Sequence, residues 1–142
     1  MLAALRAAGT DEDWLSTLPQ HQAGSIVGFL DSASASPDWA QLWLLSNEGA
    51  RSMLPEPPSL RDSVVRQLYD FFCDGRSFQH ERKELLDRLP NREFFVSGLT
   101  ALVVQTTGAQ AAWVSPFVVV AIILIGRMGI RAWCETQIRS AS

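Results

Sequence analysis

The sequence has few of the side chains that most enzymes use for catalysis or metal binding. Its 142 residues include two histidines, two cysteines and one lysine. His21 and His80 stand in no metal-ligand spacing and are interpreted as exposed or capping residues. No nucleophile elbow, phosphate-binding glycine loop or dinucleotide fingerprint occurs. The sequence therefore predicts a protein that is not an enzyme, with no cofactor, no metal and no evident small-molecule substrate.

Cysteine is too scarce to suggest a disulfide-rich domain. Cys73 and Cys134 lie far apart in mixed sequence, which is neither a disulfide framework nor a zinc-binding pattern. The apolar stretch within the first ten residues is too short for a secretory signal, and it ends at polar residues. These features favour a reducing compartment.

Positive charge is too dispersed for a general nucleic-acid-binding protein. Residues 1–58 carry two basic and seven acidic side chains, and residues 59–96 carry seven of each. Residues 97–142 carry three arginines and one glutamate. Because a nucleic-acid interface needs a concentrated basic face, the distribution predicts no nucleic-acid partner.

No segment alternates with the period of two that marks a β-strand, and helix signals recur along the chain. Thr10 precedes three acidic residues and is expected to cap a helix that buries Trp14, Leu15 and Leu18. Pro19 and the pair of Ser36 and Pro37 predict further helix starts. The sequence predicts an all-α fold, a small helical bundle.

The four residues 55–58, Pro-Glu-Pro-Pro, are the clearest break and are interpreted as a hinge. They separate an N-terminal helical part, residues 1–54, from an amphipathic helical pair, residues 59–91. The first helix of the pair starts at a Ser59 cap and ends before Gly75. The second helix, residues 76–89, is expected to turn Leu85 and Leu89 inward and Arg82 outward.

Residues 92–142 form the apolar C-terminal part. No charged side chain occurs in the 33 residues from Phe94 to Gly126. A helix without a polar face lies in a protein core or in lipid, and a membrane span needs about 20 apolar residues. The segment of about residues 92–135 is predicted to be either a single span or a helical hairpin, with arms at 92–107 and from 109 or 111 to about 135 and a turn at Gly108.

Two functional hypotheses follow from this segment. In the first, a membrane-associated protein with a cytoplasmic N-terminal part acts by insertion, oligomerisation or recruitment of a partner, as an effector would. In the second, residues 92–135 are the buried core of a cytoplasmic protein-interaction domain. The residues predicted to insert or to form the core are Val114, Phe117, Val118, Ala121, Ile122, Leu124 and Ile125.

Flanking residues supply the remaining candidate sites. Trp113, Arg127, Arg131 and Trp133 are the candidate interfacial anchors, since aromatic and basic side chains favour the edges of a bilayer. Trp39 and Trp43 share one predicted helix face and form a candidate surface for a protein partner or for self-association. The predicted partners are therefore a lipid bilayer or another protein chain.

Overall fold

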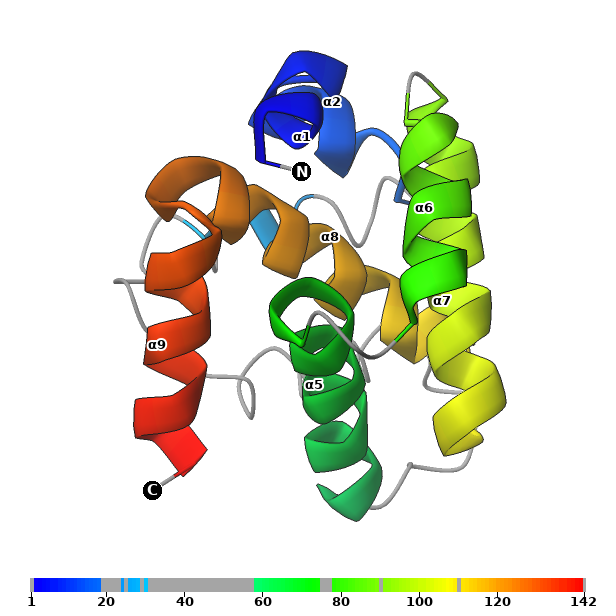
Figure 1. The fold of residues 1–142 in the computed structure, drawn as a ribbon, viewed down its shortest axis with the longest axis vertical. Coiled ribbons are helices and arrows are strands. Elements are labelled where there is room, and N and C mark those ends of the chain that lie inside the picture. Colours follow the sequence, from blue (N-terminus) through cyan, green and yellow to red (C-terminus); the bar gives the residue numbers. More distant parts are fainter. Residues whose placement is uncertain are drawn as a thin grey trace.

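A computed structural model shows a small bundle of helices (Figure 1), which confirms the predicted all-α fold. The structure describes residues 2–18, 58–74, 78–89, 91–109 and 111–141, together with residues 24, 26–28 and 30. No β-strand occurs in these ranges. The predicted helix starts at Pro19 and Ser36 and most of the predicted hinge lie outside the described residues.

Two short helices begin the chain. Helix α1 spans Leu2–Ala8 and α2 spans Asp11–Leu15. Thr10 caps α2 as predicted, because its side chain accepts from the backbone N–H of Asp13 while the Asp13 carboxylate accepts from the Thr10 N–H. This reciprocal pair is a capping box, which satisfies helix N–H groups that would otherwise lack partners.

The amphipathic pair corresponds to α5, Pro58–Cys73, and α6, Gln79–Asp87. Helix α5 begins at Pro58, so Ser59 lies inside the helix and the predicted Ser59 cap is wrong by two positions. Val64, Leu68, Phe71 and Phe72 form its inner face and are almost completely buried. Their spacing of three and four residues places them on one side of a helix.

The first arm of the predicted hairpin is α7, Arg92–Thr107. Asn91 caps its start by accepting a hydrogen bond from the Phe94 N–H at 3.0 Å. Gly108 ends it in the left-handed conformation, at φ 77°, and donates its N–H to the carbonyl of Val104. Gly adopts this conformation without the steric cost that a Cβ brings, which explains why the predicted turn at Gly108 is confirmed.

The second arm differs from the prediction of one continuous helix to about residue 135. Helix α8, Ala111–Met128, ends at Gly129, and α9 continues from Ile130 to Ala141. Gly129 has φ 96°, which a helix cannot accommodate. Figure 1 shows α8 crossing the middle of the bundle and α9 lying along one edge. Helix α8 contacts α1, α2, α5, α7 and α9 and is therefore the central element.

Candidate functional site

The most distinctive feature of the molecule is that α8 is covered on all sides. Each residue from Pro116 to Ile125 is buried. All seven residues predicted to insert or to form the core are at most 3% exposed, and Val114, Phe117, Val118, Ala121 and Ile125 are at 0%. In this arrangement the seven residues lie in the interior of the bundle.

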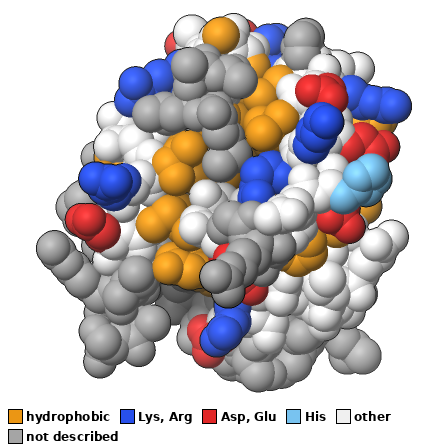
Figure 2. All heavy atoms as spheres, viewed as in Figure 1, with side chains coloured by type: hydrophobic (Ala, Val, Ile, Leu, Met, Phe, Trp, Pro, Cys, Tyr) orange, Lys and Arg blue, Asp and Glu red, His pale blue; other side chains and the backbone are white. Residues whose placement is uncertain are grey.

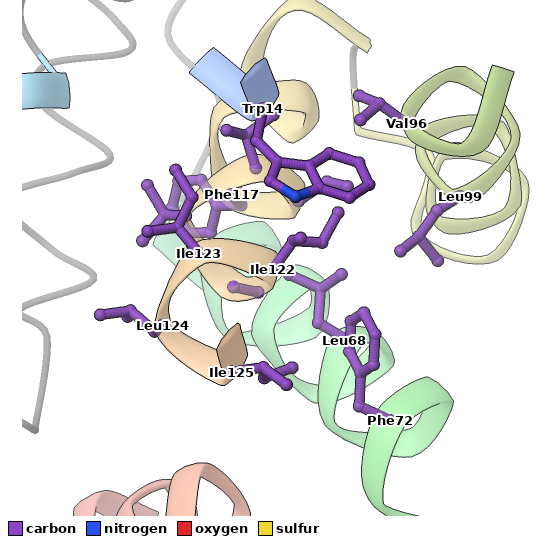
Figure 3. Close-up of a cluster of buried hydrophobic side chains, with 14 of the residues drawn as sticks. Trp14, Leu68, Phe72, Val96, Leu99, Phe117, Ile122, Ile123, Leu124 and Ile125 are labelled. Atoms are coloured by element: carbon purple, nitrogen blue, oxygen red, sulfur yellow. The ribbon is translucent and has the colours of Figure 1, made fainter. Parts of the chain in front are cut away.

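The side chains that cover α8 come from helices distant in sequence. In Figure 3, Trp14 of α2 lies against the side of α8 that carries Phe117 and Ile122. Leu68 and Phe72 of α5 and Leu99 of α7 lie on other sides of the same cluster. The burial of Leu5, Trp14, Leu15 and Leu18 in this cluster shows that the described N-terminal residues share one core with α8.

Charged side chains are exposed on two of the outer helices, α6 and α9. Glu81, Lys83, Glu84 and Asp87 are exposed on α6, and Arg131 and Glu135 are exposed on α9. Figure 2 shows red and blue side chains gathered around a histidine on one side of the molecule, with hydrophobic side chains visible between charged groups elsewhere.

Within the described residues, no single helix has the length and hydropathy needed to cross a membrane, and only Val114–Met128 together with Ile130–Thr136, a pair bent by 119°, meets both requirements.

Cys73 and Cys134 form a disulfide, with their Cα atoms 6.0 Å apart. The sequence analysis predicted no disulfide framework, and that prediction is wrong for this pair. The bond joins the last residue of α5 to α9 and closes a loop of 61 residues that contains α6, α7 and α8. Closing a loop of this length lowers the entropy of the unfolded chain, which stabilises the folded state by about 4 kcal/mol in the chain-entropy model.

A pair of aromatic rings lies beside the disulfide. The rings of Phe72 and Trp133 meet edge to face, with centroids 6.0 Å apart and planes at 80°. Trp133 is at 0% exposure, and its indole Nε1–H has no hydrogen-bond partner among the described residues. A buried donor without a partner costs about 1–3 kcal/mol, so the docking of Trp133 combines favourable apolar contact with a polar penalty.

Arg82 caps the end of α5. Its guanidinium donates to the carbonyls of Phe71 and Asp74, both at 2.7 Å, and lies 5.5 Å from the centre of the Phe71 ring. The last carbonyls of a helix lack partners within the helix, and a cation near them is favourable. Arg82 therefore binds a neighbouring helix, and the prediction that it turns outward is wrong.

Two more arginines cap helices in the same way. Arg6 donates to the carbonyl of Gly126 at 3.0 Å, near the end of α8. Arg92 donates to the carbonyl of Ala8 at 2.7 Å and lies 3.9 Å from the carboxylate of Asp13. The pKa of Asp13 lies below its ordinary 3.8. The largest cause is the hydrogen bond from the Thr10 backbone N–H, followed by the bond with the Thr10 hydroxyl and the positive charge of Arg92.

A small cavity of about 120 Å³ lies where α1 and α2 meet α8. Its lining residues are Leu5, Arg6, Gly9, Asp11, Trp14, Ile122, Ile123, Gly126 and Arg127. The charged groups around it are already bonded within the protein, since Arg127 pairs with Asp11 at 2.9 Å and Arg6 with the Gly126 carbonyl. The cavity is therefore interpreted as a gap between helices.

The candidate interfacial anchors do not form one exposed belt. Arg131 is exposed, Arg127 pairs with Asp11, and Trp133 lies inside the bundle against Phe72, which differs from its expected place at a surface. Trp133 is interior because the break at Gly129 turns α9 back onto α5. The Trp113 side chain and all of Trp39 and Trp43 lie outside the described residues.

One exposed aromatic residue was not singled out from the sequence. Phe94, in the first turn of α7, is 39% exposed, and the guanidinium carbon of Arg88 lies 4.8 Å from its ring centre. An apolar residue in the first helical turn is common and carries no signal of its own. His80, by contrast, is exposed as expected, with its side chain at 88%.

The described residues contain no group of three or more His, Cys, Asp or Glu side chains arranged to hold a metal ion. Comparison with protein-family models, with curated proteins and with solved structures finds no match to this chain.

Proposed function

We propose that the protein is a non-enzymatic all-α binding domain, which has residues 92–135 as its core and acts through contacts between its surface and another protein. The observation that carries this proposal is the complete burial of α8 from Pro116 to Ile125 beneath the helices that surround it. Because α8 is buried, the surface that such a domain offers to a partner is formed by its outer helices. This is the second of the two sequence-based hypotheses.

Among the described residues, the start of α7 offers the best contact point. Phe94 is one of two large hydrophobic side chains that are exposed there, the other being Val27. Its ring stacks with Arg88, which holds both side chains in place. Aromatic residues and arginine are enriched in protein interfaces, so this pair suits the centre of a contact.

Site-specific photocrosslinking of the full chain in its native cells tests the proposal. A benzophenone amino acid at position 94 is expected to form a discrete adduct with one protein, whereas the same group at exposed Gln79 serves as the matched control. An adduct at 94 that is lost with Arg88→Glu supports a specific contact. The same group is also placed at positions 39 and 43. The proposed function is contradicted if positions 94 and 79 crosslink equally or not at all and if positions 39 and 43 form no adduct either.

Membrane insertion is the second candidate function. It is supported by the uncharged stretch from Phe94 to Gly126 and by the bent pair of α8 and α9, which together have the length and composition of a span. Insertion requires that α8 leave its neighbours in the bundle. Alkaline carbonate extraction of membranes from expressing cells separates the two candidates, because an inserted chain stays in the pellet and a binding domain is released.

A further inference from the structure

The C-terminal helix α9 packs against both α5 and α8. It is joined to α5 by a covalent bond and, one residue away on each helix, by an aromatic contact. Cys73 and Cys134 form the covalent bond, and their neighbours Phe72 and Trp133 form the contact. About one turn before Cys134, α9 begins at Ile130 and follows α8 through Gly129, which has a positive φ and stands at a bend of 119° between the two helices. Helix α9 also lies at the edge of the bundle, as Figure 1 shows.

We propose that the Cys73–Cys134 disulfide is a redox-sensitive latch: its reduction frees α9 to swing away at Gly129, and uncovers the parts of α5 and α8 beneath it. This regulation goes beyond the proposed binding function. Both cysteines are half-buried, so a reductant reaches the bond without unfolding of the bundle. The indole Nε1–H of Trp133, which has no partner among the described residues, gains water as a partner on release, and this offsets part of the apolar contact that is lost.

The chemistry is thiol–disulfide exchange with a dithiol reductant. One thiolate of the dithiol attacks a sulfur of the pair, the S–S bond breaks, and the other cysteine leaves as a thiolate. The second thiolate of the reductant then attacks the reductant's own sulfur in the mixed disulfide, that S–S bond breaks, and the remaining cysteine leaves as a thiolate. Two electrons pass to the cysteines, which take up two protons, and the reductant leaves as its own disulfide.

Hydrogen exchange on the full chain, with and without dithiothreitol, tests this proposal. Amide protection in residues 130–136 is expected to fall roughly a hundredfold on reduction, while residues 95–103 of α7 and 117–125 of α8 stay within about threefold. The double variant Cys73→Ser, Cys134→Ser is expected to show the open α9 without reductant and no response to it. Alkylation of the untreated protein checks that both thiols are blocked.

Three results would overturn the latch. If α9 exchanges equally slowly in the oxidised and reduced chain, the disulfide does not control its position. If reduction or the double substitution removes protection from all helices together, the bond is a staple of the entire fold and not a local switch. Free thiols at Cys73 and Cys134 in the untreated protein would also contradict the proposal.

Discussion

The ring of Phe72 meets that of Trp133 edge to face, one residue away along each helix from the disulfide between α5 and α9. This contact brings residues 61 positions apart into the same interior cluster. Because the Nε1–H of Trp133 has no partner within the described part of the chain, the polar penalty offsets some of the stability that its apolar area contributes.

Replacement of Phe72 by Ala is therefore expected to be more harmful than replacement of Trp133 by Phe. Loss of the Phe72 ring from the core should cost about 3–5 kcal/mol of unfolding free energy. Trp133→Phe also removes volume, but it removes the unpaired donor as well, so its cost should stay below about 2 kcal/mol. Urea denaturation measures both. Equal losses would indicate that the indole N–H has a partner.

Gly108 and Gly126 provide a matched pair of substitutions. Gly108→Ala forces a Cβ into a left-handed conformation and should cost about 1–2 kcal/mol. Gly126 lies within α8, and a Cβ there meets nothing within 4 Å. Gly126→Ala should therefore be neutral or raise stability by up to about 1 kcal/mol. Thermal denaturation of both variants checks the prediction, which fails if Gly108→Ala is the better tolerated change.

The cap on α5 is tested by Arg82→Met, with Lys83→Met as its control. Both changes remove a positive charge from α6, but only Arg82 bonds the carbonyls of Phe71 and Asp74. We expect Arg82→Met to lower the unfolding free energy by about 1–3 kcal/mol and Lys83→Met to change it by less than about 0.5 kcal/mol. Similar effects of the two variants would show that the cap does not stabilise the fold.

Asp13 gives the fold a predictable response to acid. Its pKa is lowered in the folded protein by the Thr10 bonds and by Arg92, so the ionised carboxylate stabilises the folded state. This contribution is fully present above the unfolded pKa near 3.8 and is lost as the pH falls through the lower folded pKa. Wild type should exceed Asp13→Asn in stability at pH 7, and the difference should shrink below pH of about 4. A constant difference down to pH 2 would contradict this account.

Local signals in the sequence predict much of the fold. The Thr10 cap and the end of α7 at Gly108 depend on side-chain and backbone preferences within a few residues, and both are confirmed. The inner face of α5 follows from apolar spacing, as its burial confirms. The end of α8 at Gly129 was harder to predict, because the apolar pattern continues on both sides of it.

Long-range contacts could not be predicted from one sequence. The disulfide depends on α9 folding back onto α5, and no spacing between Cys73 and Cys134 encodes that return. The arginine caps also depend on long-range contacts. In the sequence, Arg82 stands in a charged run like any solvated residue, and only the fold brings the end of α5 beside it. For α8, the sequence predicted an apolar helix but not whether protein or lipid surrounds it. In the structure, the neighbouring helices enclose it.

The central claim, that α8 is the core of the bundle, is tested most directly by Ile122→Asp in the full chain purified without detergent. Ile122 is 1% exposed in the middle of α8, whereas the control residue Arg131 is exposed on α9. We expect Ile122→Asp to abolish the cooperative urea transition, since an unpaired charge in a core costs more than about 4 kcal/mol, and Arg131→Asp to retain it. A cooperative transition of unchanged midpoint in Ile122→Asp would contradict the claim that this helix is the protein's core.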